Sequence, residues 1–300
     1  MSKRVLITGG SGLVGRHLIR HCNNLGWDVS ILSRKRKAVD GAKVFLWNPK
    51  KDFVEDGALD CDVLVHLAGA GVADARWTTG RKKEIMESRR LPALLLAKQI
   101  RENGQGPSSI ISASGIGFYE PGDIFTLRNE QDPIGKGFLA DVCKEWESSA
   151  QEMANAGKAR LSILRIGLVM ASDGGALEKM SQPIRYLAGT PLGTGKQPVS
   201  WIHVEDLCRM ITWCAEKKLE GTFNAVAPEV ETNLSLTKGI GKVLGKPVWP
   251  IGIPSFTLRL MLGEMADILL EGQAVSPEKI KGTGFSFLFP SMDAALKDLL

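Results

Sequence analysis

The sequence predicts an α/β protein with a doubly wound parallel sheet and a small C-terminal lobe on the substrate side. Three observations predict this class. A glycine-rich turn joins a short apolar run to a helical pattern at the start of the chain, further apolar runs of strand length alternate with helical segments, and 300 residues with 44% apolar content can bury a substantial core. The length fits one large domain with a smaller appended lobe.

The first element predicts a phosphate-binding turn. An apolar run at 5–7 breaks into Thr-Gly-Gly-Ser-Gly-Leu-Val-Gly, and a helical pattern follows at once. Gly9 permits the tight turn, Gly12 lets the backbone approach a pyrophosphate, and Gly15 lets the helix pack on the strand, while the helix N-terminus attracts the anion. We therefore predict a Rossmann-type dinucleotide site, against the alternative of a glycine-rich turn without a ligand. Its contacts in this turn are Gly9, Gly12, Leu13, Val14 and Gly15.

The end of the second predicted strand, 29–32, indicates which dinucleotide binds. An NAD site usually carries an acidic residue there, which accepts hydrogen bonds from the ribose hydroxyls, but this chain has Ser33, Arg34 and Lys35. A guanidinium can hold a 2′-phosphate in two hydrogen bonds, with Ser33 donating another and Lys35 adding charge. The prediction is NADP(H), and the alternative is a solvated basic turn.

Composition excludes several other classes. The net charge of +5 is modest, and the basic run at 34–37 is better explained by a cofactor than by nucleic acid. No apolar run approaches the roughly 18 residues of a membrane span, and the first strand follows the N-terminus directly, which favours a cytoplasmic protein. The five cysteines are scattered without CxxC spacing, so we expect free thiols and no metal site.

Several ordered motifs resemble one family. The TGGSGLVG turn and Trp-Ile-His-Val-Glu-Asp at 201–206 resemble the extended short-chain dehydrogenase/reductases, which include epimerases and dehydratases. Arg76-Trp77, Glu84, Ser88-Arg89 and the Lys-Glu-Trp-Glu at 144–147 resemble a narrower group, the "epimerase family" proteins catalogued as family 39U. The resemblance covers essentially the whole chain, including a C-terminal extension.

The resemblance implies further cofactor contacts. The fourth strand, 63–67, leads into a small-residue element beside the dinucleotide, and the sixth, 161–169, reaches the nicotinamide through its backbone. Glu84 and Arg89 lie on a helix expected from about 76 to 103, and solvated surface charges are the alternative for both. The contacts that the resemblance implies are Leu67, Ala68, Gly69, Glu84, Arg89 and Val169.

The motifs do not supply the family's usual catalytic pair, because Tyr-x-x-x-Lys is absent. The only tyrosines are Tyr119 and Tyr186, and neither has a lysine four residues later. On the helix expected at 138–153, the positions of that pair hold Leu139 and Cys143. Ser114, at the end of the fifth strand, is the candidate to bind the reacting oxygen, and Tyr119 is the available phenol acid.

The second lobe is expected to begin after the sixth strand. We predict a dinucleotide domain at 1–171, with strand contributions from about 197–226, and a substrate-side lobe with its extension at 172–300. Asp206 is expected to cap or enter a helix. The apolar run 258–270 either packs in the core, which we favour, or covers the substrate cleft or a dimer surface.

Two functions from different classes follow. The first is an NADP(H)-dependent oxidoreductase or epimerase-like enzyme on a small polar substrate, of which a nucleotide sugar is one example. The second is a noncatalytic NADPH-binding sensor or regulatory partner, because the fold also hosts proteins of that kind. We expect a small-molecule substrate and neither nucleic acid nor a membrane as partner, and a homodimer is one assembly that the apolar run allows.

Overall fold

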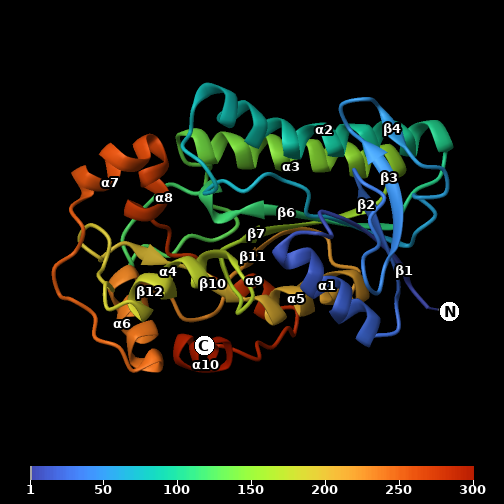
Figure 1. The fold of residues 1–300 in the computed structure, drawn as a ribbon. Coiled ribbons are helices and arrows are strands. Elements are labelled where there is room, and N and C mark those ends of the chain that lie inside the picture. Colours follow the sequence, from blue (N-terminus) through green and yellow to red (C-terminus); the bar gives the residue numbers. More distant parts are fainter. Residues whose placement is uncertain (1) are drawn as a thin grey trace.

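A large sheet forms the centre of the computed structural model, which describes residues 2–300 (Figure 1). Its strands are β1 (Arg4–Thr8), β2 (Asp28–Ser33), β3 (Lys43–Asn48), β4 (Phe53–Val54), β5 (Val63–His66), β6 (Ser109–Gly115), β7 (Arg160–Ile166) and β11 (Gly221–Ala225). Their order is β11-β7-β6-β5-β1-β2-β3-β4, and the neighbours are parallel except for β3 and β4. The strand order reverses between β1 and β5, which confirms the doubly wound class.

Helices cover both faces of this sheet (Figure 1). The helices α1 (Leu13–Asn24) and α5 (Val204–Glu216) pack together on one face, and α2 (Thr79–Asn103) and α3 (Phe138–Gly157) pack together on the other. Strand β1 shows why: Val5 and Ile7 point to the α1/α5 cluster, whereas Leu6 points to the α2/α3 cluster. Side chains alternate along a strand, so an entirely apolar strand needs cover on both faces.

Helix α2 begins three residues later than the sequence pattern predicts. The hydroxyl of Thr78 accepts a hydrogen bond from the backbone N–H of Arg81 at 3.2 Å, which caps the helix at that residue. The predicted end is confirmed, because Gly104 takes a left-handed conformation with φ of 64°.

The predicted sixth strand is wrong at its end. Strand β7 stops at Ile166, and Val169 lies in a separate strand, β8 (Leu168–Met170), which pairs with β10 (Trp201–His203). The break falls at Gly167, where a Cβ atom would lie 2.5 Å from the backbone oxygen of Ser200. From the next residue on, the chain pairs with another segment, because the backbone N–H of Leu168 donates to the oxygen of Ser200 at 2.9 Å and β8 continues beside β10.

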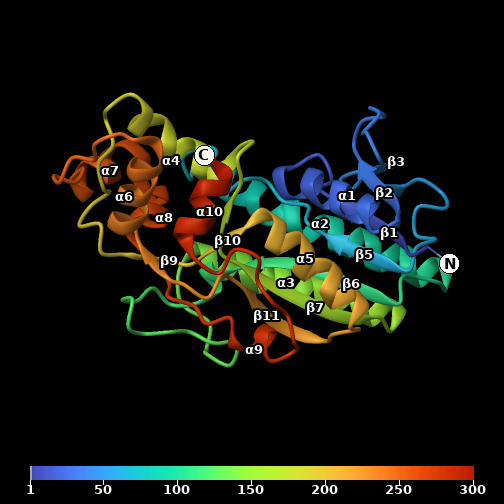
Figure 2. The same cartoon turned by 90° about the horizontal axis from the view of Figure 1, so that it is seen from below.

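The second lobe lies at one end of the sheet (Figure 2). Its elements are α4 (Gly175–Arg185), β9 (Pro198–Val199), β12 (Glu231–Thr232), α6 (Asn233–Leu244), α7 (Ser255–Leu262), α8 (Asp267–Leu270) and α10 (Met292–Leu299). Residues of α4, β9, α6 and α10 share an apolar cluster with Trp201, Leu236 and Leu296 among its members. The short α9 (Glu278–Lys281) instead packs on β11, and Ile280 joins the core below the large sheet. The predicted boundary between 171 and 172 stays a prediction.

Asp206 does not cap α5, contrary to one of the two expected roles. The cap is His203, whose ring nitrogen Nδ1 accepts from the backbone N–H of Glu205 at 3.1 Å. Asp206 lies in the first turn of α5 and is fully buried. Its carboxylate accepts hydrogen bonds from the backbone N–H groups of Leu288 and Phe289 at 2.8 and 2.9 Å. It therefore fastens the C-terminal extension to the sheet layer.

The apolar run 258–270 is only partly core, so the favoured interpretation is wrong for several of its residues. Leu258, Met265 and Ala266 are buried, but the side chains of Leu260 and Met261 are 77% and 63% exposed. The run is divided into α7, a 3₁₀ turn and α8, and one short helix can bury only one face. Within residues 2–300, no helix has both the length and the apolar character needed to cross a membrane.

Candidate cofactor and active site

The predicted phosphate turn joins β1 to α1 and lies against the end of β5. Gly9 has φ of 73°, and a Cβ atom there would lie 2.9 Å from the backbone of Leu67. A Cβ atom on Gly15 would lie 2.3 Å from the backbone oxygen of Gly9. The backbone N–H of Gly12 donates to that same oxygen at 2.9 Å and closes the turn. The glycines therefore bring the helix, the turn and two neighbouring strands into one tight corner.

The N-terminus of α1 is suited to an anion. Its N-cap is Gly12, which has no side chain to accept the first N–H groups of the helix. These groups, at Leu13 and Val14, carry the positive end of the helix dipole. Val14 also packs against the apolar cluster that Leu67 and Val169 flank. Three of the predicted cofactor residues, Val14, Leu67 and Val169, thus pack against the same apolar cluster.

The end of β2 carries the predicted 2′-phosphate residues. The hydroxyl of Ser33 donates to the backbone oxygen of Lys35 at 2.8 Å and accepts the backbone N–H of Lys35 at 3.2 Å. Its proton is therefore used within the turn, and the expected donation from Ser33 to a phosphate is not supported by this arrangement. Arg34 and Lys35 are exposed, and within residues 2–300 neither forms an ion pair. Arg36 differs, because it pairs with Glu55 at 2.9 Å.

The end of β5 is held by a hydrogen-bonded threonine. The hydroxyl of Thr8 accepts the backbone N–H groups of Leu67 and Ala68, both at 3.1 Å, and lies 2.9 Å from the ring nitrogen Nδ1 of His66. His66 is completely buried, and burial lowers the pKa of its imidazole to about 4. A neutral histidine bonded to Thr8 is a structural residue, so the small residues after it form the surface for a ligand.

Arg89 is a buried cation without a carboxylate partner. Its Nη1 donates to the backbone oxygens of Ala70 and Ile85 at 3.0 and 2.9 Å, and its guanidinium lies 4.6 Å from the ring of Trp146. Burial lowers the pKa of this guanidinium to about 10. In the described chain, its buried Nε has no hydrogen-bond partner. Seven other buried side-chain atoms also lack a partner there, among them the Nε atoms of Arg81 and Arg128, so the predicted cofactor contact of Arg89 stays a prediction.

Gly69 lies directly against the guanidinium of Arg89. A Cβ atom on Gly69 would lie 3.0 Å from the guanidinium carbon of Arg89, so a side chain at position 69 would force the arginine to shift from the strand end. The neighbouring Ser88 accepts the backbone N–H of Ala70 at 2.9 Å. Glu84 lies one turn earlier, is exposed, and pairs with Arg81 at 2.8 Å. Its predicted cofactor contact stays a prediction.

Ser114 lies under an ion pair that sequence reasoning missed. Ser114 and Arg165 are register partners on β6 and β7, and both point to the face that α3 covers. The Nε and Nη2 atoms of Arg165 donate to the two carboxylate oxygens of Glu147, at 2.8 and 2.9 Å. The hydroxyl of Ser114, which is only 3% exposed, donates to the same carboxylate at 2.8 Å.

Two signals in the sequence could have revealed this pair. Arg165 is a charge between the apolar Leu164 and Ile166 near the end of β7, and Glu147 lies on the same helical stripe as the buried Cys143 and Ala150. Charges at core positions are almost always paired. Neither observation identifies the partner, since the two residues come from different elements.

The structure does not support Tyr119 as the phenol acid. Its ring is 1% exposed, its hydroxyl donates to Oδ1 of Asn224 at 2.7 Å, and it accepts from Nη1 of Arg165 at 2.9 Å. Burial also raises the pKa of the phenol. The chain turns inward after the 3₁₀ turn at 116–118, which places Tyr119 in the protein interior rather than at a ligand.

We expect Tyr119→Phe to lower the free energy of unfolding by about 1–3 kcal/mol, because Asn224 and Arg165 then keep buried polar atoms without partners. Urea denaturation measures this change. Tyr186 is 78% exposed, so Tyr186→Phe is the matched control and is expected to be neutral. Equal effects of the two substitutions would contradict the structural role of Tyr119.

The usual tyrosine and lysine have no replacement on α3. Leu139 packs near Gly117, and Cys143 donates its thiol hydrogen to the backbone oxygen of Gly115 at 3.4 Å. Burial raises the pKa of that thiol to about 11, so it is not a nucleophile at neutral pH. Lys144, the next residue, is exposed.

The second lobe reaches the phosphate turn directly. A Cβ atom on Gly175 would lie 2.8 Å from the side chain of Leu13. Asp173 contacts Nε2 of His17 at 2.8 Å and pairs with Arg16 at 3.4 Å, both on α1. The first residues of the lobe therefore cover the N-terminal end of α1, beside the predicted pyrophosphate contacts.

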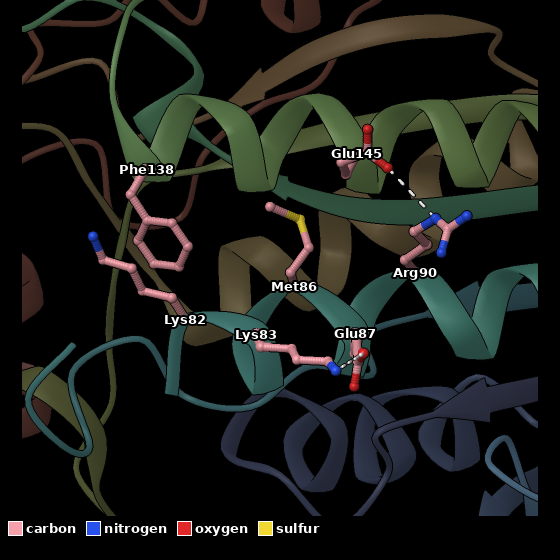
Figure 3. Close-up of a pocket in the computed structure, with 7 residues that line it drawn as sticks. All are labelled: Lys82, Lys83, Met86, Glu87, Arg90, Phe138 and Glu145. Atoms are coloured by element: carbon pink, nitrogen blue, oxygen red, sulfur yellow. Dashed lines mark ion pairs between the residues drawn. The ribbon is translucent and has the colours of Figure 1, made fainter. Parts of the chain in front are cut away.

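A groove of about 550 Å³ lies between α2 and α3 (Figure 3). It is lined by Lys82, Lys83, Met86, Glu87, Arg90, Phe138 and Glu145. None of the predicted cofactor residues lines it, because Arg89 lies on the opposite, buried side of α2. This groove is distinct from the strand-end site.

Comparisons with known proteins show the family of the chain. Residues 5–225 match the model of the "NAD dependent epimerase/dehydratase family", and residues 253–299 match the "Domain of unknown function (DUF1731)". The chain belongs to this epimerase/dehydratase family. It is 34% identical to "Epimerase family protein SH2119" from Staphylococcus haemolyticus and 33% identical to "Epimerase family protein SDR39U1" from Mus musculus, each over 99% of both chains. The predicted family 39U resemblance is confirmed.

Two solved structures share the fold of this chain. The crystal structure of human epimerase family protein SDR39U1 (isoform 2) with NADPH has a TM-score of 0.89 and 32% identity, covering 99% of this chain and 98% of that one. UDP-glucose 4-epimerase from Thermus thermophilus, in complex with NAD, has a TM-score of 0.79 at 18% identity, covering 98% and 96%. The second likeness shows the fold alone.

Proposed function

We propose that the chain is an NADP(H)-dependent oxidoreductase or epimerase-like enzyme for a small polar substrate. The residues at the strand ends fit the cofactor: Gly9 and Gly15 let the turn and the N-terminus of α1 pack closely against the ends of β1 and β5, and Arg89 holds a buried donor without a partner in the described chain. The similarity to a human protein crystallised with NADPH supports the same choice. When bound, NADP(H) supplies or removes a hydride.

The observation that carries the enzyme proposal is the position of Ser114. Ser114 is the penultimate residue of β6, two strands from the phosphate turn, at the carboxyl edge where ligands of doubly wound sheets bind. Its hydroxyl is oriented by the Glu147–Arg165 pair, and orientation of this kind is what a reacting group needs. Arg89 and the residues after β5 bind the cofactor, and Ser114 contacts the reacting oxygen.

The cofactor preference is tested at the end of β2. We expect Arg34→Ala to lower the preference for NADPH over NADH about tenfold, or about 1.4 kcal/mol, in a fluorescence titration. Arg36→Ala is the matched control, since Arg36 already pairs with Glu55 and is expected to leave the preference unchanged. A preference that survives Arg34→Ala but not Arg36→Ala would contradict the assignment of Arg34.

The reaction is tested with NADPH deuterated at C4 and a panel of small ketones, sugars and hydroxy-ketones. We expect stereospecific transfer of deuterium to a product, measured by mass spectrometry, and at least a tenfold loss of rate in Ser114→Ala. Tyr119→Phe is expected to keep its rate, because the buried phenol reaches no ligand. A Ser114→Ala variant that is as fast as the wild type would remove Ser114 from the reaction.

A noncatalytic NADPH sensor is the second candidate, and one observation favours it. Neither position of the usual tyrosine–lysine pair carries a proton donor that is free to react, and the exposed apolar side chains of α7 offer a surface for a partner. The sensor predicts tight NADPH binding without deuterium transfer to any compound. The deuterium experiment therefore distinguishes the two candidates directly.

A further inference from the structure

The hydroxyl proton of Ser114 is already committed to the protein. A serine hydroxyl has one hydrogen to donate and two lone pairs with which to accept. That hydrogen points at Oε1 of Glu147, 2.8 Å away. Because Arg165 donates to both oxygens of this carboxylate, at 2.8 and 2.9 Å, the carboxylate acts as an acceptor. The Ser114 oxygen keeps only its lone pairs for a ligand.

The arrangement is rigid as well as directional. The side chains of Arg165 and Glu147 are 5% and 14% exposed, and the guanidinium carbon lies 3.3 Å from the ring centre of Phe118. The remaining guanidinium nitrogen of Arg165, Nη1, donates to the hydroxyl of Tyr119, and that hydroxyl donates in turn to Oδ1 of Asn224. If the Ser114 hydrogen rotated toward a ligand, an oxygen of the Glu147 carboxylate would lose one hydrogen-bond donor. Because the carboxylate is largely shielded from water, this loss raises the free energy of the site.

We propose that Glu147 is a positioning residue that fixes Ser114 as a hydrogen-bond acceptor, so that the ligand group bound at Ser114 is a donor. The site therefore selects the alcohol of an alcohol–ketone pair at this position, because a carbonyl oxygen cannot donate a hydrogen bond. This inference rests on the proposed function and adds to it the chemical class of the preferred ligand.

The test compares matched ligands in complexes that cannot react. The probes are cyclohexanol with cyclohexanone, glycerol with dihydroxyacetone, and 1-phenylethanol with acetophenone, with the deuterium experiment extended to all three ketones. The alcohol is titrated into the NADPH complex and the ketone into the NADP⁺ complex, for wild type and Ser114→Ala. We expect Ser114→Ala to weaken binding of the alcohol about five- to tenfold and to change the affinity for the ketone less than twofold.

A second variant tests Glu147 itself. The side-chain amide in Glu147→Gln can donate to Ser114 and release the serine proton, so ketone binding is expected to strengthen at least threefold relative to alcohol binding. Because this change also removes the partner of Arg165, the folded state is checked by thermal melting. Ser114→Thr keeps a hydroxyl at the position and is expected to restore the alcohol preference, which a purely structural role would not predict.

The outcomes separate the two proposals. The acceptor role would be overturned if Ser114→Ala weakened binding of the ketone as much as binding of the alcohol. If deuterium were still transferred to a ketone, the proposed function would remain intact. An NADPH complex that transfers deuterium to none of the probes or panel compounds would overturn the proposed function, and the ligand preference would fall with it.

Discussion

Arg165→Met is expected to lower the free energy of unfolding by about 3–5 kcal/mol, because it leaves the buried Glu147 carboxylate without its cation. The side chain of Arg165 is only 5% exposed, so water cannot replace the lost hydrogen bonds. Ser114 alone would then face the carboxylate. Denaturation in urea, followed by circular dichroism, measures the change, and the slope of the transition reports whether unfolding stays two-state.

An exposed ion pair supplies the control for this prediction. Arg101 on α2 and Glu152 on α3 pair at 2.9 Å, but their side chains are 52% and 48% exposed. Arg101→Met is therefore expected to cost under about 1 kcal/mol. Combining Glu147→Gln with Arg165→Met is expected to recover part of the loss, since no unpaired charge remains. If the buried and exposed substitutions cost the same, the ion pair does not hold the site.

Gly15→Ala is expected to lower the free energy of unfolding by about 2 kcal/mol or more, and to weaken NADPH binding more than tenfold. The new Cβ atom would lie 2.3 Å from the oxygen of Gly9 and 2.6 Å from the Cα atom of Gly10. Both are backbone atoms, so the helix and the turn must separate to make room. The N–H groups at the start of α1 would then move away from the pyrophosphate position.

Gly80→Ala is the matched control on another helix. Nothing lies within 4 Å of a Cβ atom on Gly80, and its backbone belongs to α2. This substitution is expected to stabilise the fold by about 0.5–1 kcal/mol and to leave NADPH affinity unchanged. Titration of NADPH and urea denaturation on the two variants separate crowding in the turn from a general effect of removing a glycine. A Gly15→Ala protein with full affinity would show that the turn does not hold the cofactor.

The layered sheet and the phosphate turn could be predicted because their signals are local. The centres of β1 and β5, residues 5–7 and 63–65, are short apolar runs that need cover on both faces. Gly12 and Gly15 are crowded by the backbone of Gly9 and Gly10, a few residues earlier in the chain. Such contacts belong to one strand–turn–helix unit, so a sequence pattern can represent them.

Errors appear where distant segments decide the local structure. Strand β7 ends early because the backbone of Ser200, on a different segment, approaches Gly167. His203, not Asp206, caps α5, and the carboxylate of Asp206 instead accepts the backbone N–H groups of Leu288 and Phe289. No pattern around each residue contains the partner that decides its role.

The sequence by itself determined the layered fold, the dinucleotide turn and the basic end of β2, because repeated apolar runs and closely spaced glycines act through neighbours along the chain. Only the tertiary structure decided what Ser114 and Tyr119 can do. Both hydroxyls donate to side chains from other elements, Glu147 on α3 and Asn224 on β11. The direction of a hydrogen bond depends on both partners, and folding alone brought these partners together.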